Sequence, residues 1–195
     1  MVHPHSELRY INEKIGYGVV ATRLIPRGTI TWVADPLDQV LTPEEVERIP
    51  PVLQPLLEKY SWINGKGLTV LCWDHARFIN HSCEATCLSP GFDFEIAVRD
   101  ILPGEQLTDD YGMLNPQEPF LCHCGSPRCR GFILPDDFLK HGAEWDRMLS
   151  QAVPLIRTCE QPLWPLVAEK AEVERVLSGA ASLPSCMVHY LGTTV

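Results

Sequence analysis

Arg77-Phe78-Ile79-Asn80-His81-Ser82-Cys83 is the stretch of sequence that decides the fold. Taken by itself, its histidine would be interpreted as a satisfied buried side chain, which is the commoner fate of a lone histidine. Three other segments of the chain, considered together with this stretch, favour a functional interpretation. They are Gly16-Tyr17-Gly18, the run from Gly104 to Gly112, and a cysteine cluster from Cys122 to Cys129.

The cysteine cluster, Cys122-His123-Cys124-Gly125-Ser126-Pro127-Arg128-Cys129, places three thiols within eight residues. Gly125 and the Ser126-Pro127 pair allow the backbone to fold back, so all three sulfurs can face one point. A tetrahedral zinc site needs four ligands, with about 2.3 Å between the metal and each sulfur. We therefore predict that Cys122, Cys124 and Cys129 bind zinc.

Spacing does not decide the fourth zinc ligand. Cys83 is the first candidate and Cys87 the second, and His81 and His123 are more distant alternatives. A redox role is disfavoured because it normally needs a Cys-x-x-Cys pair, which the cluster lacks. A nucleic-acid-binding zinc module is also disfavoured, because few basic residues lie nearby.

Composition limits the class of protein. The chain has 195 residues, of which 45% are hydrophobic and 21% charged, so it suits one globular domain with or without an appendage. Its formal net charge of -9 argues against direct binding of nucleic acid. We expect no membrane span, because no apolar run reaches 18 residues, and we see no signal peptide. We therefore expect an intracellular protein whose cysteines are reduced.

The pattern of residues predicts many short strands followed by a helical tail. Strands broken by tight turns are expected over residues 8 to 34, and further strands over 68 to 73 and 94 to 99. The strand at 94 to 99 alternates, with Glu95 on the face opposite Phe94. Thr42 and Pro43 predict a helix start, and the prolines at 50, 51 and 55 should break that helix or start a second one. From about residue 137 onward the pattern is helical.

Taken in order, the four segments resemble the SET-domain lysine methyltransferases that carry a post-SET zinc motif. The resemblance covers about residues 8 to 133, and the run from Arg77 to Cys83 is its most specific part. It implies a mostly β fold with some α structure: several small sheets around a pseudoknot, with a helical C-terminal tail. In this crossing, the Asn80-His81 segment would pack against the segment from Leu107 to Tyr111.

The resemblance also implies a domain organisation. Residues 1–117 would form the SET domain, with a variable insert at 35–62 that helps to shape the substrate groove. Residues 118–135 would form the post-SET zinc motif. Residues 136–195 would form a helical extension that the resemblance does not cover. This extension could cover the cofactor pocket, extend the groove, form a homodimer contact or simply pack on the sheet.

Roles for individual residues follow from the same resemblance. Tyr111 would be the catalytic tyrosine, and Cys83 the fourth zinc ligand beside Cys122, Cys124 and Cys129. S-adenosylmethionine would be the cofactor and the zinc would be structural. The cofactor would lie against a group of residues from three segments: Gly16, Tyr17, Gly18, Asn80, His81, Phe120 and Leu121.

Several of these residues have simpler explanations when each is considered alone. Gly16 and Gly18 could form a hairpin turn, and Tyr111 could be a core tyrosine with a hydrogen-bonded hydroxyl. Only the joint order of the segments favours the functional interpretation. Tyr17 and Tyr60 are secondary candidates for the lysine channel. Trp32, Trp62 and Trp73 would line the core or the groove.

The implied function is transfer of a methyl group to a lysine amine of a protein or peptide substrate, either a histone or another protein. Alignment of amine, methyl and sulfur would supply much of the acceleration, and an apolar channel would favour the neutral amine by desolvation. The alternative function is a catalytically weak SET-like domain that binds a peptide or regulates a partner. Methylation of a non-lysine acceptor is a third hypothesis. The protein would act in the cytoplasm, or in the nucleus if it is eukaryotic or delivered to a host.

Two positions depart from the family pattern. The family commonly continues Asn-His-Ser-Cys with one residue and then Pro-Asn, whereas this chain continues with Glu84-Ala85-Thr86-Cys87. The position two residues before the catalytic tyrosine is usually aromatic and influences how many methyl groups are added. Here it is Asp109, whose carboxylate could hydrogen-bond an ammonium, hold the amine protonated or point away from the channel.

Overall fold

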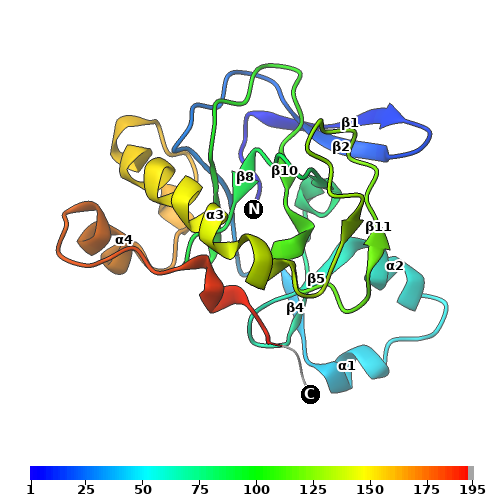
Figure 1. The fold of residues 1–195 in the computed structure, drawn as a ribbon. Coiled ribbons are helices and arrows are strands. Elements are labelled where there is room, and N and C mark those ends of the chain that lie inside the picture. The colour runs from blue at the N-terminus through cyan, green and yellow to red at the C-terminus, as the bar shows by residue number, and fades with distance from the viewer. Residues whose placement is uncertain (193–195) are drawn as a thin grey trace.

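The structure is a computed structural model and describes residues 1–192 (Figure 1). It consists of short strands in five small sheets, with helices inserted among them and at the C-terminal end. The strands are β1 (Ser6–Asn12), β2 (Gly16–Ala21), β3 (Ile30–Val33), β4 (Gln39–Leu41), β5 (Ser61–Ile63), β6 (Thr69–Leu71), β7 (Asn80–His81), β8 (Cys87–Leu88), β9 (Phe94–Ala97), β10 (Thr108–Asp109), β11 (Phe120–Leu121) and β12 (Phe132–Ile133). The helices are α1 (Pro43–Glu47), α2 (Gln54–Tyr60), α3 (Asp137–Ala152) and α4 (Lys170–Leu177), with 3₁₀ turns at His75–Phe78, Tyr111–Met113, Val153–Thr158, Trp164–Leu166 and Cys186–His189.

The predicted fold class is confirmed. Four sheets are antiparallel: β1-β2, β3-β9-β8, β4-β6-β5 and β11-β12. The fifth joins β7 and β10 in parallel, with Asn80 opposite Thr108 and His81 opposite Asp109. This pairing brings the two segments of the predicted crossing together, although 26 residues separate the end of β7 from the start of β10.

The insert between β4 and β5 begins as its sequence predicts. Thr42 caps α1 by accepting a hydrogen bond from the Glu45 backbone, and the Glu45 side chain accepts one from the Thr42 backbone. This reciprocal cap satisfies two backbone donors that the first helical turn would otherwise leave free. The chain then breaks at Pro50 and Pro51 before α2 begins, and both helices lie at one edge of the molecule in Figure 1.

The helical tail packs on the β3-β9-β8 sheet and belongs to the same core. Phe138, Trp145 and Leu149 follow one face of α3 and are buried together with Ile30 and Ile96. Of the outcomes left open for the extension, packing on the sheet is the one observed. The last three residues of the predicted extension, 193–195, lie outside the described residues.

Strand β9 is more deeply buried than its alternating pattern predicts. All of its residues are buried, including Glu95, whose exposed fraction is 7%. The reason is its central position in the three-stranded sheet, where the face opposite the tail meets the second hydrophobic cluster around Trp32 and Cys72. None of the helices within residues 1–192 is both long enough and apolar enough to cross a bilayer.

Candidate active site and metal centre

A cavity of about 840 Å³ lies between the insert and the segment that follows Tyr111. Its wall is mostly apolar and aromatic, and it includes Tyr60, Trp62, Ile79 and Phe120. Its size and character suit a small organic group or an extended side chain. Tyr111 and Trp32 also line it.

Tyr111 is held in place from both of its ends. Its backbone N–H donates to Nδ1 of His81 at 3.1 Å, and its hydroxyl donates to the Ile79 carbonyl at 2.7 Å. Burial raises the pKa of Tyr111 well above its usual value, and the nearby Asp109 and Glu95 carboxyls act in the same direction. The hydroxyl therefore stays protonated at neutral pH, and its oxygen can accept a further contact from the cavity.

The glycines at the start of β2 serve two different structural needs. Gly16 has a φ of +82°, which suits glycine at the hairpin turn. A side chain at Gly18 would place its Cβ 2.6 Å from Nδ2 of Asn80 and 2.3 Å from Oε1 of Gln106. The same Asn80 amide donates to the Tyr17 carbonyl and to Gln106. The hairpin is thus tied directly to β7, as expected if both segments hold one ligand.

The predicted cofactor residues do not all face the cavity. Phe120 lines it and packs against Tyr111, with 6.3 Å between the ring centroids. The others lie outside its wall, and those with large exposed apolar side chains are Tyr17 and Leu121. The structure therefore separates the predicted site into two parts. One is the cavity; the other, called the adjoining surface here, is formed by Gly16, Tyr17, Gly18, Asn80, His81 and Leu121. Tyr111 lines the cavity and contacts His81 of the adjoining surface.

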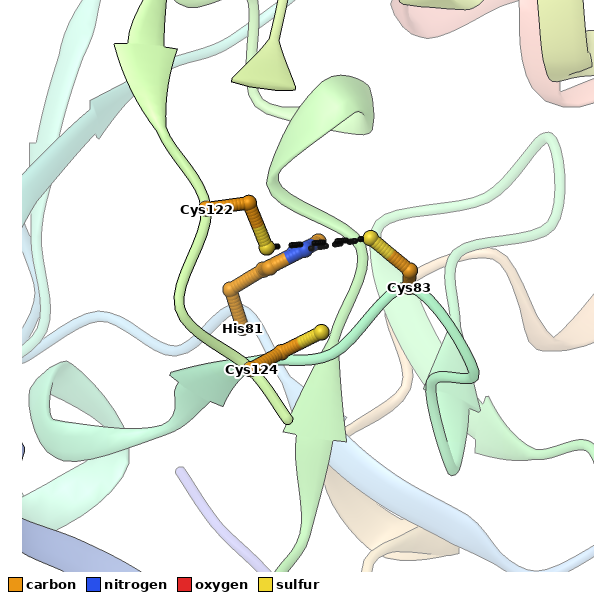
Figure 2. A group of neighbouring side chains, drawn as sticks. All are labelled: His81, Cys83, Cys122 and Cys124. Carbon is orange, nitrogen blue, oxygen red and sulfur yellow. Dashed lines mark hydrogen bonds between the residues drawn. The ribbon is translucent and has the colours of Figure 1, made fainter. Parts of the chain in front are cut away.

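Thiols and an imidazole converge beside this surface. Figure 2 shows His81 and Cys83 meeting Cys122 and Cys124, and one ligand atom from each lies within 4.8 Å of the others. The sulfurs of Cys83 and Cys122 are 3.7 Å apart. Two sulfurs on a tetrahedral zinc ion would be separated by about 3.8 Å, given bonds of about 2.3 Å. These residues therefore fit a zinc ion.

The hydrogen bonds of His81 decide which role it can play. Burial lowers the pKa of His81, so the ring is neutral and carries a single proton. Because Nδ1 accepts from the Tyr111 backbone, that proton must be on Nε2. Nε2 lies 3.3 Å from the sulfur of Cys83 and donates to it. A nitrogen that carries a proton cannot also bind a metal, so in this tautomer His81 donates to Cys83, whereas loss of the Nε2 proton would make it one of the four possible ligands.

Cys129, the third predicted thiol of the cysteine cluster, is exposed and lies outside this converging group. Its sulfur is 3.9 Å from the Cys122 carbonyl oxygen. Cys87, the second candidate for the fourth ligand, is fully buried on β8 and lies outside the group, as does His123.

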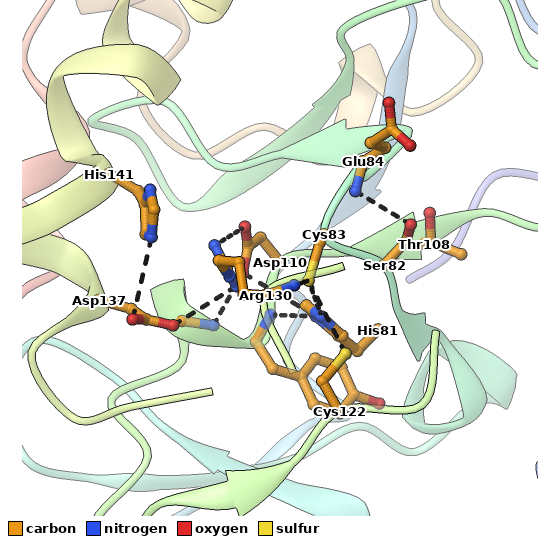
Figure 3. Close-up of polar contacts among 12 residues, drawn as sticks. His81, Ser82, Cys83, Glu84, Thr108, Asp110, Cys122, Arg130, Asp137 and His141 are labelled. Atoms are coloured by element: carbon orange, nitrogen blue, oxygen red, sulfur yellow. Dashed lines mark hydrogen bonds and ion pairs between the residues drawn. The ribbon is translucent and has the colours of Figure 1, made fainter. Parts of the chain in front are cut away.

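The sequence did not single out the ion pair that joins this cluster to Tyr111. Asp110 directly precedes Tyr111 and is buried. Arg130, which follows Cys129, donates to both carboxylate oxygens of Asp110, at 2.9 and 2.5 Å. Figure 3 shows Arg130 lying between Asp110 and Asp137 of α3. The Arg130 backbone also donates to the sulfur of Cys83. The arginine beside the last cysteine was visible in sequence, but nothing indicated its partner.

Glu84, at the first departure from the family pattern, has a structural role. Its carboxylate accepts from the Ser126 hydroxyl and from Nε of Arg128, the latter at 3.1 Å. The turn after Cys83 is therefore fastened to the cysteine loop by side chains of its own.

The chain has matches among protein families, curated proteins and solved structures. Residues 16–112 match the family model of the SET domain. The histone-lysine N-methyltransferase trithorax of Drosophila virilis is 45% identical over 65 residues, which is 30% of this chain and 2% of that protein. The histone-lysine N-methyltransferase ash1 of Drosophila melanogaster is 30% identical over 138 residues, 64% of this chain and 6% of that protein. The crystal structure of the methyltransferase domain of human SETMAR gives a TM-score of 0.46 at 23% identity, covering 68% of this chain and 58% of that chain.

Residues 16–112 are therefore a SET domain, and the chain belongs to the family of SET-domain proteins. The curated relatives that it resembles are histone-lysine N-methyltransferases, and the chain spans only 2% and 6% of the length of the two described above.

Proposed function

We propose that this chain is an S-adenosylmethionine-dependent protein lysine methyltransferase. The observation that carries the proposal is the position of Tyr111, whose hydroxyl is fixed on the Ile79 carbonyl at the wall of a largely apolar cavity. The curated relatives support it, because each is named as a histone-lysine N-methyltransferase.

The cavity would prepare the lysine for reaction. A free lysine amine has a pKa near about 10.4 and is protonated at neutral pH. An apolar passage lined by Tyr60, Trp62 and Phe120 would lower that pKa by desolvation. The fixed Tyr111 oxygen would orient the amine toward the adjoining surface. Alignment of this kind can supply a large part of the rate enhancement.

The adjoining surface would hold the cofactor. When bound, S-adenosylmethionine supplies a methyl group on a positively charged sulfur, which a neutral amine displaces. Gly16, Tyr17, Gly18, Asn80, His81, Phe120 and Leu121 would form its site. Gly18 and Asn80 fit this role, because a side chain at Gly18 would collide with the Asn80 amide, and within the described residues Oδ1 of Asn80 accepts no hydrogen bond.

A zinc ion held by Cys83, Cys122, Cys124 and Cys129 would fasten the post-SET segment over this surface. The protonated Nε2 of His81 would stabilise the bound Cys83 sulfur. The metal would be structural, since a neutral amine displaces the methyl group without further activation. The division into 1–117, 118–135 and 136–195 would follow from this arrangement.

A histone is the substrate that the relatives suggest, and it would place the protein where chromatin is. The net charge of -9 suits a basic histone tail. A homodimer through the C-terminal extension remains a prediction, and the apolar face of α3 is already buried within the chain.

Transfer of a labelled methyl group from S-adenosylmethionine to histones and to lysine-containing peptides tests the proposal. We expect transfer by the natural chain, and a loss of about 100-fold in Tyr111→Phe, because the hydroxyl that positions the amine is removed. Tyr10→Phe is the matched control, since Tyr10 is exposed on β1 and should keep full activity.

The peptide-binding alternative makes a different prediction for the same assay. A binding module would bind peptide without transferring a methyl group to any substrate. The natural chain and Tyr111→Phe would then be equally inactive. Full activity in Tyr111→Phe would contradict the role given to Tyr111.

A further inference from the structure

Two acidic side chains meet in the buried part of the cavity wall. Glu95 lies on β9 and Asp109 on β10, and both line the cavity. Their exposed fractions are only 7% and 9%, and their carboxyl groups are within hydrogen-bond distance of each other. Tyr111 lies near enough for both carboxyls to affect its hydroxyl. The carboxyl pair therefore stands next to the place where the substrate nitrogen would react.

The pair lacks a partner within the described part of the chain. Glu95 Oε2 and Asp109 Oδ1 are buried without a hydrogen-bond partner, and neither residue takes part in an ion pair among residues 1–192. Trp32 pairs with Glu95 across β3 and β9, and its buried Nε1–H, on the same cavity wall, is also unpartnered. Buried polar groups are normally satisfied, and each one left open costs about 1–3 kcal/mol. A donor and two acceptors left open on one cavity wall point to a polar ligand.

The charge of the pair follows from its burial. Desolvation raises the pKa of Glu95 to about 7 and that of Asp109 well above its usual range. Glu95 raises the pKa of Asp109 further, whereas a hydrogen bond from Asp109 lowers the pKa of Glu95. At neutral pH Asp109 is therefore protonated and Glu95 is partly ionised, so the pair carries at most one negative charge. Such a pair accepts hydrogen bonds and attracts a cation, whereas an aromatic side chain at residue 109 would offer neither property.

We propose that the Glu95–Asp109 pair receives the N–H groups of the substrate amine, so that the site selects lysine nitrogens that still carry hydrogen. This inference rests on the proposed function and names the substrate state that the site prefers. Unmethylated and monomethylated lysine can donate from the neutral amine that reacts, whereas neutral dimethyl-lysine has no N–H. The third methyl transfer would leave both carboxyls unpaired, so the enzyme should stop before trimethyl-lysine.

Binding of small cations tests the pair without requiring methyl transfer. We expect butylammonium to bind the natural chain at least tenfold more tightly than butyltrimethylammonium, as followed by the fluorescence of Trp32 and Trp62 in the cavity wall. The double variant Glu95→Gln, Asp109→Asn keeps the shape and removes the charge, and its preference should fall below twofold. Glu95→Gln alone is the second variant, and its preference should be intermediate.

Glu118→Gln is the control for general attraction, because Glu118 lines the exposed part of the same cavity. This variant should weaken the binding of both cations equally and leave the ratio of their affinities unchanged. Equal affinities for the two cations in the natural chain would overturn the proposal, as would an unchanged preference in the double variant. Tighter binding of butylguanidinium than of butylammonium would overturn the assignment to an amine.

A transfer assay separates this inference from the proposed function. On any substrate that the natural chain methylates, mass spectrometry should find monomethyl- or dimethyl-lysine and no trimethyl-lysine. Trimethyl-lysine as the main product would overturn the inference while confirming the methyltransferase. Absence of transfer together with the N–H preference would overturn the methyltransferase and leave the cation site standing.

Discussion

At the scale of single residues, His81 holds Tyr111 and Cys83 in fixed positions, whereas the carboxyl groups of Glu95 and Asp109 are buried at a cost in folding free energy. The His81 ring receives the Tyr111 backbone on one nitrogen and faces Cys83 with the other. One neutral imidazole thus orients the tyrosine beside the cavity and the thiol of the metal centre. Glu95 and Asp109 are different, because their burial costs folding free energy that nothing within the described chain returns.

This burial predicts how stability depends on pH. The pKa of Glu95 is about 7 in the folded protein, against 4.5 for its ordinary value, so the folded state holds a proton that the unfolded chain releases. The free energy of unfolding should therefore fall as pH rises from about 4.5 to 7. Glu95→Gln should remove this loss, which amounts to about 3 kcal/mol. Urea unfolding at pH 5 and pH 8 measures the difference.

Glu105→Gln should behave in the opposite way. Partial burial raises the pKa of Glu105, but its hydrogen bonds to Arg99 and to the Leu102 backbone outweigh that effect and lower it. This variant should lose stability above about pH 4.5, where the natural carboxylate is charged. A Glu95→Gln variant with the same pH dependence as the natural chain would show that Glu95 titrates normally.

At the scale of elements, the cysteine loop is joined to Asp110 and to the turn at Cys83 and Glu84 by several independent contacts. Arg130 binds Asp110, its backbone reaches Cys83, and Glu84 holds Ser126 and Arg128. Zinc would be the centre of this junction, so its removal should loosen the segments on both sides.

We expect one zinc ion per chain, which metal analysis by mass spectrometry would measure. Cys124→Ser and Cys129→Ser should each lose it, because each removes a thiolate ligand. Cys159→Ser is the matched control, since Cys159 is outside the cluster and should leave the zinc content unchanged. Retention of zinc by Cys129→Ser would instead make His81 the fourth ligand.

Elements whose signals are local could be predicted from the sequence. Thr42 and Pro43 predict the start of α1, and the prolines after it separate α1 from α2. The resemblance supplied the crossing of β7 with β10, which no local pattern contains. The Glu95–Asp109 pair could not be predicted, because the alternation of β9 indicates which residues share a face but not whether the second face is covered.

At the scale of the whole molecule, the insert, the segment that follows Tyr111 and the C-terminal tail are joined at Asn115. This buried residue has a φ of 51°, and its side chain donates to the Ile63 and His189 carbonyls and accepts from the Leu191 backbone. Three segments far apart in the sequence therefore depend on one amide group.

Asn115→Ala should lower the free energy of unfolding by about 2–4 kcal/mol, because it leaves three backbone groups without partners and keeps a left-handed backbone that alanine disfavours. Denaturant titration measures the loss. Asn12→Ala is the control, since Asn12 only accepts from the nearby backbone of Lys14 and Ile15 and should cost less than 1 kcal/mol. Equal losses in the two variants would contradict the role given to Asn115.

The long-range pairing of β7 also fixes when the site can form as the polypeptide leaves the ribosome. Asn80 and His81 emerge early, yet their strand partner is Thr108–Asp109, and the sulfur of Cys83 meets its neighbours only after Cys122 and Arg130 have been synthesised. Because α3 then supplies Asp137 to Arg130 and part of the core, synthesis must proceed through α3 before these contacts of β7 and Cys83 are complete. A ribosome stalled before residue 122 would therefore display residues 16–112 without Cys122, Cys124 and Cys129 of the proposed zinc site.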